Sequence, residues 1–361
     1  MRRSAPAEFL MTGLLMTGLL TTGLFLQTLL PFLLLLGSAA AIYFACEFFV
    51  NGVEWLGRRL SVGSTATATI LAAFGTALPE SAITFVAVAF GKSDAQRELG
   101  VGAALGGPLV LATIAYATVG ATLILSHQHL LRSPAVRQEF KRLSRDQTWF
   151  LSIFVVKLAV GLVAFAYKPW LGVAFLGAYA LYFWKEMSRD DSGEIDDVLE
   201  PLTFARKRAG PPPLGLAALQ TGLALVVIFA ASRLFVSQLD AIGPVLGIEP
   251  QLLALLLSPI ATELPETMNA IIWVRQGKHR LALANISGSM MIQATVPTAF
   301  GLFFTPWLLD RSLIMAGVVT AIAVAVMLVS FARGVISRGF LASMGLFYVL
   351  FAVVLLVLHV R

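Results

Sequence analysis

The sequence predicts an all-α polytopic membrane protein of about ten transmembrane helices, arranged as two inverted five-helix repeats behind an apolar N-terminal extension. Three observations predict this fold. The 361 residues are 58% hydrophobic and only 13% charged, with a mean hydropathy of +0.84, which is outside the usual range of soluble domains. The apolar residues form runs long enough to cross a bilayer, which takes about 20 mostly apolar residues. One half of the chain also repeats the other.

Apolar runs separated by charged or turn residues predict the individual spans. They cover residues 31–56, 64–90, 99–125, 148–166, 169–184, 214–239, 251–274, 281–305, 313–332 and 339–359. Only the four residues "YKPW" (167–170) separate the fourth run from the fifth, so this boundary is the least marked. A closed β-barrel is not expected, because alternation of apolar and polar residues is missing.

The first 30 residues form a further apolar segment, "EFLMTGLLMTGLLTTGLFLQTLL", ahead of Pro31. A single helix over residues 8–56 would be about 73 Å long, which is more than one span can use. We therefore expect residues 1–30 to form an extra or peripheral helix outside the functional core. The alternatives are a signal-like extension and a start at Met11 or Met16.

The net charge of +6 comes from lysines and arginines that gather on one side of the predicted topology. Most of those outside the spans lie in the connections after the odd-numbered spans, such as Arg58, Arg59 and Lys141. The positive-inside rule then places these connections, including residues 188–213, in the cytoplasm and the C-terminus outside. The distribution of lysine and arginine over the two sides of the membrane therefore explains the net positive charge. We expect the protein to lie in the lipid bilayer of the cell (inner) membrane and not to bind nucleic acid.

The repeat is visible when the chain is compared with itself. The segment "GTALPES" (75–81) aligns with "ATELPET" (261–267) at an offset of 186 residues. Downstream, "GVGAALGGPLVLAT" (100–113) aligns with "ALANISGSMMIQAT" (282–295) at an offset of 182. These matches predict a first repeat over residues 31–187 and a second over 214–361, joined by the 188–213 loop.

Each repeat contains five predicted spans, an odd number, so the second copy must enter the membrane from the opposite face. This inverted arrangement is typical of secondary transporters, whose sites form near the bilayer midplane where discontinuous helices of the two copies meet. It predicts that the two aligned "LPE" segments meet inside the membrane.

The aligned segments carry residue types that suit a cation. Pro79 and Pro265 each remove a backbone hydrogen bond and disturb the carbonyl four residues earlier, so both are expected to break their helices. Glu80 and Glu266 follow directly, and Ca2+ is bound by carboxylate and carbonyl oxygens. A charged carboxylate at membrane depth costs about 2.5 to 3.5 kcal/mol, which a shared divalent cation would offset. The alternative is that each glutamate is protonated and only donates a hydrogen bond between helices.

With the downstream "ALANISGSM", these segments resemble the two alpha repeats of the calcium/cation antiporter superfamily, which includes the sodium/calcium exchangers. The resemblance covers nearly all of residues 31–361. It implies ten helices and cation antiport by alternating access, with Ca2+ and Na+ as transported ions and no cofactor. It also implies that Glu80 and Glu266 bind Ca2+, and that the remaining cation-binding oxygens come from Thr76, Thr262, Asn285, Ser289 and Gln293.

The departures from the family pattern lie mainly in the first copy. The small hydroxyl residue expected after the threonine is Ala77 in the first copy and Glu263 in the second. The polar residue Gln293 of the second copy is matched by Leu111, so most side chains associated with sodium sites are missing from the first copy. Glu263 adds a third carboxylate, for which a proton would be a natural counter-ion. Pairing of Glu263 with Arg233 or Lys157 is the other interpretation.

Three functions follow in order of preference. The first is Ca2+ exchange against Na+ by alternating access, the second is exchange of Ca2+ or another cation against H+ with Glu263 as the extra protonatable group, and the third is a cation channel. An enzyme is not expected, because the paired glutamates lack the nucleophile or metal ligands that an intramembrane hydrolase needs.

Overall fold

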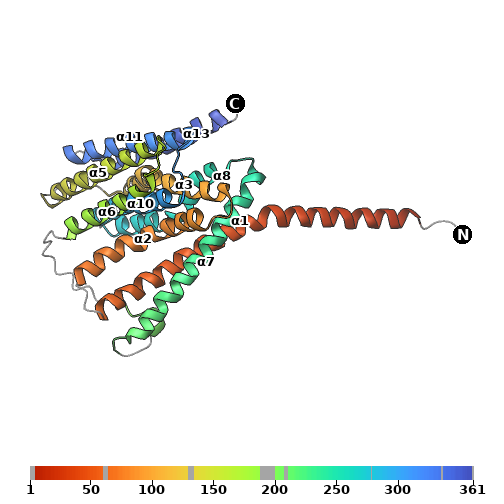
Figure 1. Ribbon diagram of the computed structural model, residues 1–361, viewed down its shortest axis with the longest axis horizontal. Helices are drawn as coiled ribbons and strands as arrows, with labels where there is room; N and C mark the ends of the chain where they lie inside the picture. Colours follow the sequence, from red (N-terminus) through yellow and green to blue (C-terminus); the bar gives the residue numbers. More distant parts are fainter. Residues whose placement is uncertain are drawn as a thin grey trace.

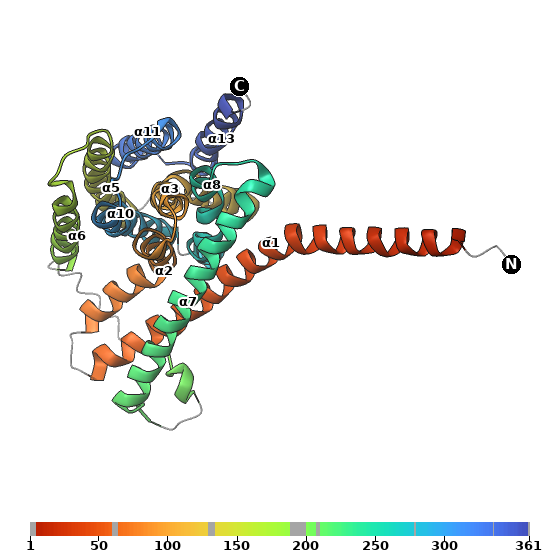
Figure 2. The ribbon, with the colours of Figure 1, turned by 45° about the vertical axis from the view of Figure 1, so that its right-hand side comes forward.

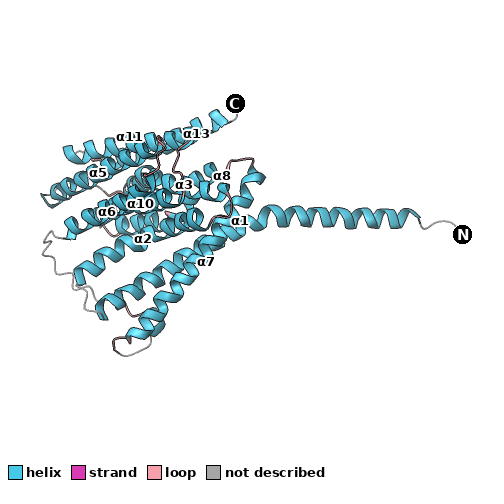
Figure 3. Ribbon diagram, in the orientation of Figure 1, coloured by secondary structure: helices cyan, strands magenta, loops and turns pink. Residues whose placement is uncertain are grey.

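The computed structural model describes residues 5–59, 64–128, 134–187, 200–206, 210–277, 279–334 and 336–359. All regular elements in these ranges are helices (Figure 3). In chain order they are α1 (Ala5–Arg59), α2 (Ser64–Phe90), α3 (Asp94–Val110), the π-helix η1 (Leu111–Ala115), α4 (Tyr116–Leu125), α5 (Pro134–Gly161), η2 (Lys168–Trp170), α6 (Leu171–Met187), η3 (Thr203–Ala205), α7 (Leu214–Leu246), α8 (Pro250–Thr262), α9 (Leu264–Arg275), α10 (His279–Phe304), α11 (Arg311–Arg333), α12 (Arg338–Ser343) and α13 (Gly345–His359).

Each predicted apolar run falls on one helix or on consecutive helices of the described ranges. The least marked boundary is real, because α5 ends at Gly161, before the expected end near residue 166, and η2 leads into α6. By length and composition, five helical segments of the described chain are able to cross a membrane: Leu29–Val53, Asp94–Leu125, Leu214–Leu246, Arg311–Arg333 and Arg338–Leu355. Membrane crossing by all ten runs stays a prediction.

The apolar extension is helical from Ala5 and runs without interruption through Pro31 into the first predicted span. The resulting helix, α1, has 55 residues and is about 83 Å long at 1.5 Å per residue. Figures 1 and 2 show its N-terminal part projecting from the helical bundle, while its C-terminal part lies alongside α7. The extension is therefore the outer part of α1 and not a separate helix.

The middle of the bundle is formed by the helices that carry the repeated motifs. Helix α2 packs on α3 and α10, and α3 packs closely on α8. Gly106 allows this approach, since a Cβ atom there would lie 2.5 Å from the carbonyl oxygen of Leu255 and 2.5 Å from Cγ of Pro259. Gly288 is the aligned position of the second copy, and a Cβ atom there would meet no other side chain or neighbouring helix within 4 Å.

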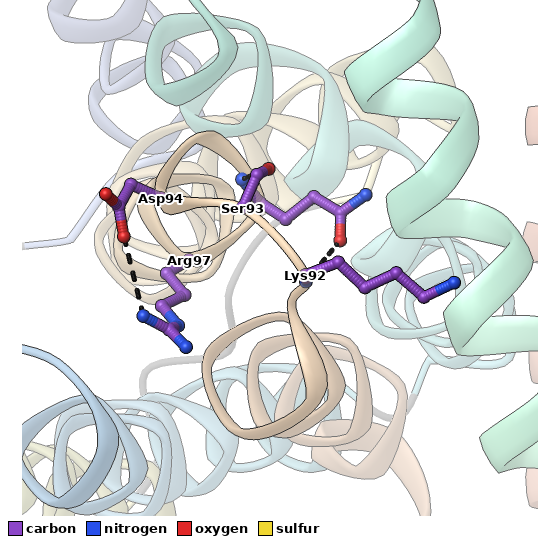
Figure 4. Close-up of polar contacts among 5 residues, drawn as sticks. Lys92, Ser93, Asp94 and Arg97 are labelled. Carbon is purple, nitrogen blue, oxygen red and sulfur yellow. Dashed lines mark hydrogen bonds and ion pairs between the residues drawn. The ribbon is translucent and has the colours of Figure 1, made fainter.

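The start of α3 is defined by local hydrogen bonds (Figure 4). The Ser93 hydroxyl caps the helix by accepting from the backbone N–H of Gln96 at 3.2 Å. Arg97 forms an ion pair with Asp94 at 3.4 Å. The Gln96 side chain also donates to Asp240 of α7 at 3.0 Å, which ties the two helices together at this end.

Candidate cation site

The two aligned motifs have different backbones. Helix α2 continues through Pro79, whereas α8 ends at Thr262 and α9 begins at Leu264. Glu263 lies between them with φ −91° and ψ 3°, and Pro265 then occupies the first turn of α9, where its missing N–H is tolerated. The expected break is present in the second motif, while the first motif is a continuous helix.

Glu80 of the first motif contacts the second motif directly. Its carboxylate is 1% exposed and accepts a hydrogen bond from the Thr262 hydroxyl, with Oγ1 and Oε2 2.5 Å apart. Thr262 Oγ1 also lies 3.0 Å from the carbonyl oxygen of Ser258. The second carboxylate oxygen of Glu80, Oε1, has no hydrogen-bond partner among the described residues. This buried oxygen remains able to bind a ligand.

Glu263 and Glu266 complete a group of three buried carboxylates. Glu263 is 2% exposed and accepts from the Gln293 side-chain amide of α10 at 2.5 Å. It also interacts electrostatically with Glu266 and with Glu80. Glu266 is fully buried in the first turn of α9. The structure therefore joins the acids of both motifs into one electrostatic cluster.

The polar residues of α10 follow one face of that helix. Ser289 is four residues before Gln293, and Asn285 is four residues before Ser289, a spacing that places all three on the same side. Ser289 is buried, and the half-buried Asn285 has an amide nitrogen without a hydrogen-bond partner in the described part of the chain. Gln293 of this row contacts the Glu263 carboxylate. The side chain of Thr76 lies outside the described residues.

The acids alone do not make a metal site. Within the described ranges, no group of three His, Cys, Asp or Glu side chains is arranged to hold a metal ion. A hard cation takes six to eight oxygen ligands, so hydroxyl, amide and backbone oxygens would have to complete its shell. The hydroxyl of Thr262 lies beside Glu80, and the buried side-chain oxygen Oε1 of Gln293 has no hydrogen-bond partner among the described residues; both oxygens are of the right type.

From the sequence, Arg233 and Lys157 were the two alternative partners of Glu263. The hydrogen bond that Glu263 accepts comes instead from the side-chain amide of Gln293. Arg233 instead lies over the rings of Phe90 and Phe229, at 5.5 Å and 5.4 Å from their centroids.

Lys157, considered from the sequence only as a partner of Glu263, lies close to the first motif instead. It is fully buried in α5, donates to the carbonyl oxygen of Ala104 at 2.8 Å, and interacts electrostatically with Glu80. A lone charge inside the predicted span 148–166 is the signal that could have assigned it to the site, since charged residues at membrane depth are usually functional.

A helical membrane protein with buried acids from two related motifs has the features expected of an ion transporter. The model of the sodium/calcium exchanger protein family matches residues 30–185 and 216–357, so the chain belongs to this family of cation exchangers. It is an integral membrane protein of the ion antiporter type.

Two proteins are similar in sequence to most of this chain. The putative antiporter CaxA of Alkalimonas amylolytica is 25% identical over 305 residues, which cover 82% of this chain and 88% of CaxA. The inner membrane protein YrbG of Escherichia coli (strain K12) is 26% identical over 284 residues, covering 77% of this chain and 81% of YrbG.

Solved structures share the fold at lower identity. The H+/Ca2+ exchanger CAX matches with a TM-score of 0.61 and 16% identity, over 91% of this chain and 88% of CAX. Native YfkE matches with a TM-score of 0.63 and 14% identity, over 91% and 92%. The sodium-calcium exchanger NCX_Mj matches with a TM-score of 0.53 and 17% identity, over 89% and 97%. At these identities the likeness concerns the fold.

Proposed function

We propose that the protein is a secondary active antiporter that exchanges Ca2+ for Na+ by alternating access at the Glu80–Glu266 site. The observation that carries the proposal is the hydrogen bond from Thr262 to Glu80, because it links the two aligned motifs inside the bundle. The family model matches the chain in two blocks, 30–185 and 216–357, which supports a division into two halves. In the proposal each half is a five-helix repeat, and the two repeats are inverted.

The chemistry of the cluster favours a divalent cation. Glu80 and Glu266 together carry two negative charges when ionised, and both are removed from water. Ca2+ neutralises both charges with one ion and accepts the neutral oxygens of Thr262 and Gln293. In this proposal Thr76, Asn285 and Ser289 supply further oxygens as the site changes between its two access states.

Exchange against H+ is the second candidate, and Glu263 is the residue that favours it. Glu263 adds a third carboxylate to a cluster that a divalent ion neutralises only in part, and a proton would balance the remaining charge. The first copy also offers Ala77 and Leu111 where polar residues stand in the second. The membrane we propose is the cell (inner) membrane, with the 188–213 loop in the cytoplasm and the C-terminus outside.

The test is isotope flux in proteoliposomes. Ca2+ uptake should require an opposing gradient of Na+ or H+, and it should be abolished by Glu80→Gln and by Glu266→Gln. Clamping pH while varying Na+, and the reverse, identifies the counter-ion. Unchanged uptake in both glutamine variants would refute the site, and uptake without any exchanged ion would identify a channel instead.

A further inference from the structure

Lys157 is a fully buried lysine placed between the helices that form the site. Its ammonium nitrogen Nζ lies 2.8 Å from the carbonyl oxygen of Ala104 in α3 and 3.4 Å from the carbonyl oxygen of Gln293 in α10. An ammonium buried at membrane depth is costly, so its surroundings must be suited to a cation.

The two carbonyls are available because of two prolines. Pro108 lies inside α3 and Pro297 lies inside α10. In a helix, the N–H of these residues would donate to the carbonyls four residues earlier, which are those of Ala104 and Gln293. Proline has no N–H, so both carbonyls lose their helical partner, and Lys157 contacts these same two oxygens.

The rest of the surroundings also favours a single positive charge. The ammonium lies 5.4 Å from the ring centroid of Phe154 and 5.7 Å from that of Trp307, within the range of cation–π attraction. Glu80 interacts with it electrostatically. Two freed carbonyls, aromatic faces and a nearby carboxylate make up an environment that a monovalent metal ion could also occupy, as at discontinuous helices of other transporters.

We propose that the ammonium of Lys157 is a tethered cation that takes the place of one monovalent ion beside the transport site. This rests on the proposed function, because it assigns Lys157 a role in the ion stoichiometry of that exchange. The lysine supplies one positive charge that stays with the protein throughout the cycle, so the exchanger moves one monovalent cation fewer for each Ca2+.

The experiment measures the ratio of 22Na+ to 45Ca2+ fluxes in proteoliposomes for the wild type, Lys157→Met and Lys157→Arg. The Met variant is expected to move one Na+ more per Ca2+ than the wild type does. If the wild type is coupled to protons alone, its ratio of Na+ to Ca2+ flux is zero, and that of the Met variant should be one. The Arg variant keeps the charge and should keep the wild-type ratio. A Met variant that transports Ca2+ with the wild-type ratio would overturn the proposal.

A binding measurement covers the case in which the Met variant is too unstable for flux. Relative to choline chloride, sodium chloride should raise the melting temperature of purified Lys157→Met by more than it raises that of the wild type, whose transport site also binds Na+ in the proposed exchange. Adding Pro108→Ala and Pro297→Ala restores the two N–H donors, so the combined variant should lose this additional response and match the wild type. An equal response to Na+ in the wild type and the Met variant would count against the tethered cation.

These outcomes are separate from those that test the proposed function. Ca2+ flux that survives Glu80→Gln and Glu266→Gln refutes the transport site itself. Loss of flux in those variants together with an unchanged ratio in Lys157→Met refutes only the role of the lysine.

Discussion

Thr262 and Glu80 are 182 positions apart in the chain, and their side chains meet in a hydrogen bond of 2.5 Å in the buried centre of the bundle. The hydroxyl donates and the carboxylate accepts, so the bond orients one oxygen of Glu80 and leaves the other, Oε1, without a hydrogen-bond partner in the described ranges. The contact therefore links the two motifs, and in the proposed exchange it would orient the Glu80 carboxylate toward the cation.

Replacing Thr262 by valine should weaken Ca2+ binding without changing the size of the side chain. A hydrogen bond to a charged group contributes about 1.5 to 3 kcal/mol, which corresponds to a loss of affinity of about 10-fold to 150-fold. The measurement is 45Ca2+ binding to the purified protein, with Thr262→Ser as the matched control that keeps the hydroxyl. Equal affinities of the Val variant and the wild type would contradict an ion-binding role for this contact.

Glu263→Gln should separate proton coupling from Ca2+ binding. The variant removes a titratable group and keeps a side chain of the same shape beside Gln293. We expect Ca2+ uptake driven by a pH gradient to fall at least about 10-fold. A 10-fold decrease corresponds to a loss of about 1.4 kcal/mol of coupling free energy. Uptake driven by Na+ at clamped pH is the internal control. If pH-driven uptake is undiminished, Glu263 does not carry the proton.

Gly106→Val should disrupt the bundle, because its side chain would start within 2.5 Å of the Leu255 carbonyl oxygen, which belongs to the backbone of α8 and cannot move independently. We expect a loss of folded protein, or a decrease in stability of about 1 to 3 kcal/mol, the usual cost of overpacking. Size-exclusion profiles and melting curves in detergent measure it. Gly288→Ala is the control at the aligned position, since a Cβ atom there would meet no other side chain or neighbouring helix within 4 Å.

Lys168→Met should loosen the loops next to α5 without directly affecting the site. Lys168 donates to the carbonyl oxygens of Val163 at 2.6 Å and Trp307 at 2.9 Å, and so joins the α5–α6 connection to the segment after α10. Burying these carbonyls without a donor costs about 1 to 3 kcal/mol, which should appear as a lower melting temperature. The exposed Lys92 provides a control substitution to Met. An identical melting temperature in the two variants would show that the Lys168 contacts contribute nothing.

The positions of the helices were predictable because they follow from local patterns. Apolar runs locate helices directly, and the alignment of "GTALPES" with "ATELPET" selects Glu80 and Glu266 without knowledge of packing. The family match confirms the resemblance on which the antiporter class was expected.

The contacts of the site could not be predicted in the same way. Glu263, at the break between α8 and α9, and Gln293 of α10 are 30 residues apart, and the packing of α9 against α10 brings them together. The role of Lys157 depends on two carbonyls, in Ala104 and Gln293, that come from different helices again. Such contacts are set by tertiary packing, which no periodicity in the sequence records.

Because of the break at Glu263, the second motif is divided between two helices that can change their angle, whereas the first motif lies in one continuous helix. Helix α2 is one uninterrupted helix of 27 residues, about 40 Å long. Helix α9 has 12 residues, is about 18 Å long, and begins directly after the break at Glu263. Tilting α9 about Glu263 would shift Glu266 relative to Glu80, while α2 kept its shape. Because Glu263 itself lies at this break and Glu266 directly after it, a change in the angle between α8 and α9 would alter the arrangement of these two acids relative to Glu80.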